Sequence, residues 1–234
     1  MKNIVVKIGG SLLFTKQRKI NTKKLTEFCD IIKQKKGFKS IVIVCGGGII
    51  ARDYIDSVRN GSDNEAMCDI MGIEISRINA KLIITHLGED AYPVVPKTVE
   101  DVSIALQYNK IVVMGGLQPG QSTTSVAAEI AEYIKADQLV ILTDVDGIFD
   151  KDPKTHKTAK LIEHLDYNQL QDLILNNFGD EQAMAGEYRI FDVVSLQILR
   201  RSNLNVLIAS GENLTQFRNY WKGDSGIIGT EISN

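Results

Sequence analysis

The sequence predicts an α/β protein, a three-layer α/β/α sandwich in which helices cover both faces of a mainly parallel central sheet. Two observations lead to this fold class. Short continuous apolar runs, of the length of buried strands, alternate with segments of helical periodicity. Glycine-rich loops follow several of these runs, as at the carboxyl ends of strands in open parallel sheets. No linker, repeat or low-complexity segment interrupts the chain, so we expect a single domain over residues 1–234.

The expected elements follow one another as strand and helix. The apolar runs NIVVKI, SIVIVC, KIVVM, QLVILT and NVLIA predict strands at residues 3–8, 40–45, 110–114, 138–143 and 205–209, and a closing strand is expected near 226–232. Helical periodicity predicts helices at about 21–37, 49–58, 65–86, 123–135, 167–176 and 192–202, and a last helix that ends at Trp221. Residues 177–191 show neither pattern and are predicted to form a loop.

The composition excludes several classes of protein. The formal net charge is −2, so no global field would attract nucleic acid or an acidic membrane. No segment approaches the ~20 apolar residues of a membrane span, and the first residues reach glycines before an apolar stretch of export length. The three cysteines show no paired spacing, which favours reduced thiols in a cytosol. We therefore expect a cytoplasmic protein.

Residues 143–153, TDVDGIFDKDP, place four aspartates around one glycine. An EF-hand calcium loop needs oxygen ligands at positions 1, 3 and 5, glycine at 6 and glutamate at 12. With Gly147 at position 6, position 1 is Leu142 and position 12 is Pro153, so the spacing excludes this calcium loop. Two interpretations remain: a polar turn after a buried strand, or a nucleotide site where carboxylates meet magnesium and ribose hydroxyls.

Glycines follow three of the predicted strands, at residues 9–10, 46–48 and 115–116. Without a Cβ, such a loop can bring its peptide N–H groups close to phosphate oxygens. The chain has no P-loop motif and no protein-kinase H-R-D or D-F-G motif. Residues 46–51 fit the spacing G-x-G-x-x-A of a dinucleotide-binding fingerprint. This fingerprint also requires an acidic residue about 20 positions later, at the end of the next strand. The residue at that distance is Asp69, which lies in a helical segment instead.

Two further features indicate an anion site. Lys7 lies at the end of an apolar strand, where its charge needs a partner unless the strand is an edge strand or the side chain reaches water. Residues 117–124, LQPGQSTT, combine a Pro-Gly turn with hydroxyl groups at a predicted helix start. Ser122 or Thr123 would cap this helix, and the remaining N–H groups of the same turn could hold a phosphate.

The segments VKIGGS, VCGGGIIAR, MGGLQPGQSTTSVAAEIA and LTDVDGIFDKDP resemble the amino acid kinase superfamily and, within it, the uridylate (UMP) kinases of the archaeal type. The resemblance extends nearly end to end. It implies an α/β/α sandwich that transfers the γ-phosphoryl group of ATP to UMP with magnesium, in pyrimidine nucleotide biosynthesis. It also implies a homo-oligomer, commonly a hexamer. Contacts to UMP and the phosphates are expected in the N-terminal part, and contacts to the ATP nucleoside from about residue 138.

The resemblance also assigns roles to matching positions. The catalytic residues it implies are Lys7, Arg52 and Asp146. The ATP-binding residues are Gly9, Gly10, Ser11, Gly48, Arg52, Thr143, Asp144, Phe149 and Asp152. The UMP-binding residues are Gly47, Asp69, Leu117, Gln118, Pro119, Gly120, Gln121, Ser122 and Thr123. Asp146 is expected to bind magnesium, directly or only through phosphates or water.

Three positions depart from the family pattern. Many relatives have asparagine where Asp144 stands, tyrosine where Phe149 stands and aspartate where Thr124 stands. Since Thr124 carries no charge, any role of that carboxylate must be absent or taken over, and Asp146 is the candidate. Two alternatives to a UMP kinase remain: a related kinase for isopentenyl phosphate, carbamate or an amino acid, and a non-catalytic nucleotide or oxoanion-binding protein. The polar LQPGQSTT argues against an isoprenoid pocket.

Overall fold

The computed structural model describes residues 2–34, 37–151, 153, 156–178, 190–224 and 226–234. These residues contain a seven-stranded sheet of order β3-β2-β1-β4-β6-β7-β5. Its strands are β1 (Lys2–Ile8), β2 (Phe38–Cys45), β3 (Val112–Met114), β4 (Gln138–Thr143), β5 (His164–Leu165), β6 (Val206–Ser210) and β7 (Gly229–Ile232). Neighbouring strands pair in parallel except β6 and β7. The predicted mainly parallel α/β fold is confirmed.

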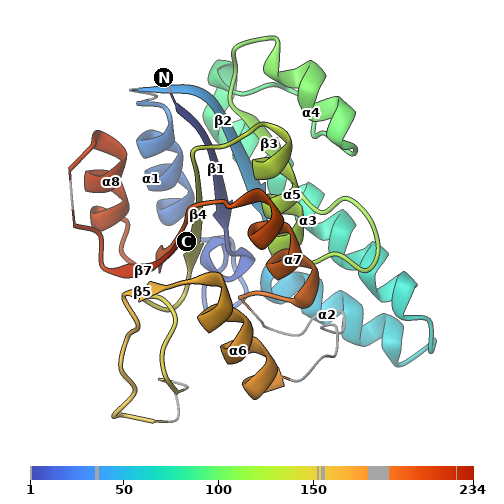
Figure 1. Ribbon diagram of the computed structural model, residues 1–234. Helices are drawn as coiled ribbons and strands as arrows, with labels where there is room; N and C mark the ends of the chain where they lie inside the picture. The colour runs from blue at the N-terminus through green and yellow to red at the C-terminus, as the bar shows by residue number, and fades with distance from the viewer. Residues whose placement is uncertain (1, 35–36, 152, 154–155, 179–189, 225) are drawn as a thin grey trace.

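Helices cover both faces of this sheet (Figure 1). One face packs against α1 (Thr22–Ile32), α3 (Glu65–Leu87) and α8 (Thr215–Lys222). The other packs against α4 (Val99–Leu106), α5 (Thr123–Tyr133), α6 (Tyr167–Phe178) and α7 (Val193–Ser202). Helix α2 (Gly48–Arg59) lies along α3, and short 3-10 helices occupy Gly10–Leu13 and Gly88–Asp90. In β1, Ile4, Val6 and Ile8 point to the first face and Val5 to the second, so both faces are buried.

The structure differs from the prediction at three elements. Helix α1 ends at Ile32 rather than at Gly37, because the lysine-rich residues before Gly37 offer no apolar face. Gly37 has φ of 85° and accepts a hydrogen bond from Lys2 N, so it belongs to the entry of β2. Helix α4 and the short strand β5 were not predicted. The start of α4 did carry a signal, since Thr98 and Asp101 form a capping box.

Most of the loop predicted at 177–191 lies outside the described residues, although α6 extends to Phe178 and α7 is capped by Asp192. Among the helices that the structure describes, none combines the length and apolar character needed to cross a membrane.

Candidate functional site

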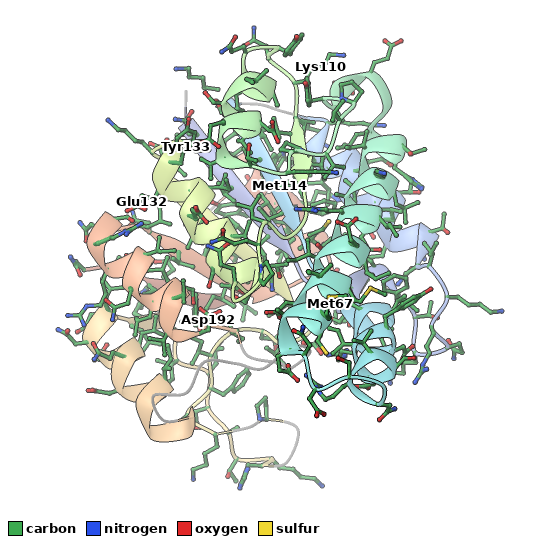
Figure 2. All side chains as sticks on the ribbon, turned by 90° about the vertical axis from the view of Figure 1, so that its right-hand side faces the viewer. Met67, Lys110, Met114, Glu132, Tyr133 and Asp192 are labelled. Atoms are coloured by element: carbon green, nitrogen blue, oxygen red, sulfur yellow. The ribbon has the colours of Figure 1, made fainter. Side chains whose placement is uncertain are left out.

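Five strand ends lie side by side at one edge of the sheet, which we call the carboxyl edge. The strands β3, β2, β1, β4 and β6 are neighbours and run in parallel, so the loops that follow them meet there. Met114, the last residue of β3, lies between α3 and α5 in Figure 2. Ligands of open α/β sheets bind outside this edge. The fold therefore brings together the glycine loops, the LQPGQSTT segment and the aspartate cluster.

The first two glycine loops pack backbone against backbone. A Cβ on Gly10 would lie 2.1 Å from Gly48 N and 2.7 Å from Gly46 O, which is too close for any real contact. Gly48 has φ of 69°, and a Cβ there would lie 2.4 Å from Gly10 O. These glycines are therefore required by the contact between the two loops, in addition to any approach by phosphate.

Lys7 lies in the middle of the sheet, paired with Val44 of β2 and Ile141 of β4. The edge-strand alternative is therefore wrong. By strand alternation its side chain shares a face with Val5, the face that α5 covers. Burial lowers the pKa of Lys7 to about 8, against an opposing effect of the Asp144 carboxylate. An anion bound beside Lys7 would raise this pKa again and hold the lysine in its charged form.

Arg52 is a second cation beside the glycine loops. It is half-buried on α2, four residues after the helix begins at Gly48. Within the described part of the chain its side chain makes no hydrogen bond or ion pair, whereas the side chain of the adjacent Asp53 pairs with Arg18 at 3.0 Å. An arginine with no protein partner close to two loops of this kind can serve a bound anion.

Asp69 joins helix α3 to the LQPGQSTT segment. Its Oδ2 accepts a hydrogen bond of 2.8 Å from the peptide N–H of Gly120, 51 positions away. Gly120 has φ of 79°, so the Pro-Gly turn uses the left-handed conformation that glycine tolerates. The second carboxylate oxygen has no partner among the described residues. Asp69 and residues 117–123, which the sequence assigned to one ligand, thus lie together.

Three residues of α3 that sequence reasoning missed hold the same loops. Ser76 Oγ accepts a hydrogen bond from Gly116 N at 2.7 Å, and Arg77 donates to the carbonyls of Gly116 and Leu117 at 3.1 and 3.0 Å. The buried Asn79 donates from Nδ2 to Gly46 O at 2.9 Å and Gly47 O at 3.2 Å. The available signal was that these three residues and Glu74 place four polar side chains among the apolar residues of IEISRINA.

Helix α5 begins at the carboxyl edge with Ser122 as its N-cap, whose Oγ accepts from Ser125 N at 3.1 Å. The peptide N–H groups of Thr123 and Thr124 have no partner among the described residues, so the positive end of this helix can receive an anion. The hydroxyl of Thr123 faces the second glycine loop, 3.5 Å from where a Cβ on Gly46 would lie.

A buried carboxylate, Asp192, lies beside this helix start. Ser125 Oγ donates to Asp192 Oδ1 at 2.7 Å, and Asp192 also caps α7 (Figure 2). Burial alone would raise the pKa of Asp192, but hydrogen bonds from Ser195, Ser122 and Ser125 outweigh this effect and lower it. The sequence suggested Asp146 as a substitute for the carboxylate that many relatives carry at the position of Thr124. A different carboxylate, that of Asp192, contacts the start of α5 next to the buried Thr124.

The aspartate cluster follows β4 at the same edge. Thr143 is buried, Asp144 and Phe149 are half-buried, and Asp146 is exposed. The segment is anchored by the buried Thr230 of β7, whose Oγ1 accepts from Ile148 N at 2.8 Å and packs against Gly147. Phe149 forms an isolated bridge with Leu161. Asp152, also assigned to ATP, lies outside the described residues.

Comparisons with known proteins agree with this architecture. Residues 2–210 match the amino acid kinase family. The chain is 43% identical to a uridylate kinase of Methanobrevibacter smithii over 90% of this chain and 92% of that protein. It is 34% identical to a uridylate kinase of Methanothermobacter thermautotrophicus, with 98% of each covered. The crystal structure of uridylate kinase from Archaeoglobus fulgidus superimposes with a TM-score of 0.82 at 30% identity over the whole of both chains.

Proposed function

The chain belongs to the amino acid kinase family, and within this family we propose that it transfers the γ-phosphoryl group of ATP to UMP, giving ADP and UDP in pyrimidine nucleotide biosynthesis. The observation that carries the proposal is the meeting of Lys7, Arg52 and two glycine loops with Asp69 and residues 117–123 at one sheet edge. The first group suits phosphates, and the second suits the sugar and base of an acceptor nucleotide.

In this reaction the nucleophile is a phosphate oxygen of UMP, which is already ionised near neutral pH and needs no general base. The difficulty is to bring two anions together. Lys7, Arg52 and the free N–H groups at the start of α5 neutralise the phosphates and hold them for in-line transfer without a covalent intermediate. Ser11 and the peptide N–H groups of Gly10, Gly47 and Gly48 complete this contact, whereas the N–H of Gly9 already donates to Leu142 O at 2.8 Å.

We assign the ATP nucleoside to the part of the chain from about residue 138. Thr143, Asp144 and Phe149 are the proposed contacts that lie within the described residues. In the described residues no cluster of three or more acidic, histidine or cysteine side chains is placed to hold a metal ion. Magnesium, however, is commonly held by one or two carboxylates together with substrate phosphates. The exposed Asp146 and nearby Asp144 fit that arrangement, and bound magnesium would neutralise charge on the ATP phosphates.

An ADP-release assay tests the proposal directly. The purified protein is mixed with ATP and a panel of acceptors that includes UMP, CMP, isopentenyl phosphate, carbamate and glutamate, each with magnesium and with a chelator. We expect UMP to give by far the highest kcat/KM and the chelator to abolish it. A higher kcat/KM for another acceptor would identify that compound, and not UMP, as the substrate. No turnover with any acceptor would favour the alternative of a non-catalytic nucleotide or oxoanion-binding protein.

The ribose contact of Asp69 gives a sharper test. Because its free oxygen would accept a hydrogen bond from a ribose hydroxyl, dUMP would leave a desolvated acceptor unpaired at a cost of roughly 1–3 kcal/mol. We therefore expect kcat/KM to favour UMP over dUMP by about 5- to 150-fold. Asp69→Asn should narrow this ratio and raise the KM for UMP, with little change in the KM for ATP.

The ratio matters because Asp69 also holds Gly120, so a raised KM alone could reflect a displaced loop. Glu74→Gln, an exposed change on the same helix, is the control and should leave the ratio at the wild-type value. If Asp69→Asn shifts the constant for ATP and keeps the UMP:dUMP ratio, Asp69 does not contact the ribose.

We also propose that the protein is a homo-oligomer, with a hexamer as the expected state. The two helices α2 and α3, which pack against each other, expose large apolar side chains: Tyr54 on α2, and Met67, Ile70 and Ile78 on α3. Grouped apolar side chains of this kind mark protein interfaces. Sedimentation velocity should give a multiple of the chain mass, and Ile78→Arg should reduce it. A monomer at micromolar concentration would contradict the proposal.

The three cysteines are free and buried, as expected in a reducing compartment, and we propose the cytoplasm as the place of the reaction.

A further inference from the structure

Side chains of helix α3 make four hydrogen bonds to the backbone of the loop that follows β3. Ser76 accepts from the N–H of Gly116, Arg77 donates to the carbonyls of Gly116 and Leu117, and Asp69 accepts from the N–H of Gly120. The start of the loop is pressed against the helix, since a Cβ on Gly115 would lie 2.4 Å from Ser76 Oγ and 2.7 Å from Arg77 N. The backbone of this loop is therefore oriented by the side chains of α3.

The two carbonyls held by Arg77 determine where the adjacent N–H groups point. In a trans peptide the C=O of one residue and the N–H of the next point in opposite directions, and the described residues contain no cis peptide bond. The N–H groups of Leu117 and Gln118 are thus directed away from the guanidinium. Neither donates a hydrogen bond to any described residue. The loop presents two oriented donors with no protein acceptor.

We propose that Arg77 is a positioning residue for the acceptor: by holding the carbonyls of Gly116 and Leu117, it directs the N–H groups of Leu117 and Gln118 toward oxygen atoms of UMP. The inference rests on the proposed function, which names UMP as the acceptor. Arg77 itself does not touch the nucleotide. Its role is to fix donors that would otherwise lose orientation in a glycine-rich segment.

Arginine is suited to this role because its planar guanidinium donates in fixed directions from separate nitrogen atoms. Nε bonds to Gly116 O and one terminal nitrogen to Leu117 O, while the other terminal nitrogen pairs with the exposed Glu74 at 2.7 Å. The side chain of Arg77 is largely buried, with 13% of its surface exposed, and that of Glu74 is 54% exposed. The ion pair on the solvent side therefore contributes little, and the two carbonyl bonds hold the loop.

Calorimetric titration of UMP and of ATP, each alone, distinguishes positioning from general destabilisation. Arg77→Met keeps an unbranched stem but no donors, and we expect it to weaken UMP binding by about 10- to 100-fold. ATP binding should change little, and kcat at saturating UMP should fall much less than kcat/KM for UMP. Arg77→Lys, which retains one donor group, should lie between the wild type and Arg77→Met.

Glu74→Gln is the matched control, since it removes only the solvent-side ion pair, and it should bind UMP like the wild type. An unchanged UMP affinity in Arg77→Met, or equal losses for UMP and ATP, would overturn the role of Arg77. If Arg77→Met does not fold, Arg77→Lys decides by the same comparison. Failure of the wild-type protein to bind UMP would appear before any variant is compared and would count against the proposed function itself.

Discussion

Lys7→Met should lower kcat by about a thousand-fold or more, with a much smaller effect on the affinity for UMP. A single oriented donor at a reacting centre contributes about 10²–10³ in rate, and a cation on a transferring phosphoryl group about 10³–10⁵. Lys7 occupies the central strand at the carboxyl edge, between the ends of β2 and β4. Its charge should matter most where negative charge moves during transfer, so the loss appears in kcat.

The same substitution should make the unliganded protein more stable at pH 7. Burial lowers the pKa of Lys7 from 10.5 to about 8, so below pH 8 folding buries a charge at a cost. At ~1.36 kcal/mol per pKa unit, this cost is on the order of 3 kcal/mol, and methionine does not incur it. Between pH 8 and about 10.5 the unfolded chain binds more protons than the native protein, so wild-type stability should rise with pH in this window.

Denaturant unfolding of both proteins at pH 7 and pH 10, together with steady-state kinetics, tests the two effects. The stability advantage of Lys7→Met should shrink at pH 10. If Lys7→Met had the kcat of the wild type, the assignment of Lys7 to the reaction centre would be wrong. A less stable Lys7→Met at pH 7 would show that the lysine is held by stronger favourable contacts than Asp144 provides.

The strands and the site loops could be predicted because both depend on local sequence. Each buried strand is a continuous apolar run, and each loop at the carboxyl edge follows such a run directly. The order of the strands was not predicted, nor was the antiparallel entry of β7, since both are set by pairing between distant segments. Strand β5 contains only His164 and Leu165, which is too short for any periodicity.

The hydrogen bonds by which α3 supports the loops could not be predicted from the sequence either. Periodicity identified the helix, but Ser76, Arg77 and Asn79 bond to residues 32 to 40 positions away, and no local pattern reports such a partner. The structural role of the glycines could be predicted only in part from the sequence, for the same reason. Their positions after strands suggested phosphate approach, yet only the three-dimensional structure shows that Gly10 and Gly48 also need to be glycines to contact each other.

Gly10→Ala should therefore destabilise the fold as well as the reaction. The added Cβ would lie 2.1 Å from Gly48 N and 2.6 Å from Gly48 Cα, and these are backbone atoms that cannot rotate away. Overpacking of this kind costs roughly 3 kcal/mol or more when backbone must shift. For a protein of this size that corresponds to a fall in Tm of roughly 6–12 °C. Displacing the loops should also lower kcat/KM by about 100-fold, since a shift of about 1 Å can have that effect.

Gly61→Ala is the matched control for this prediction. Gly61 follows α2 with a φ outside the left-handed region, and a Cβ there would meet only Val58 O at 3.7 Å, so its Tm and kcat/KM should match the wild type. Differential scanning calorimetry with and without saturating ATP and UMP, alongside kinetics, separates two roles of Gly10. A large loss of activity at an unchanged Tm would mean that Gly10 serves ligand approach alone. A lowered Tm with normal kcat/KM would mean that the contact between the loops stabilises the fold without placing the reacting groups.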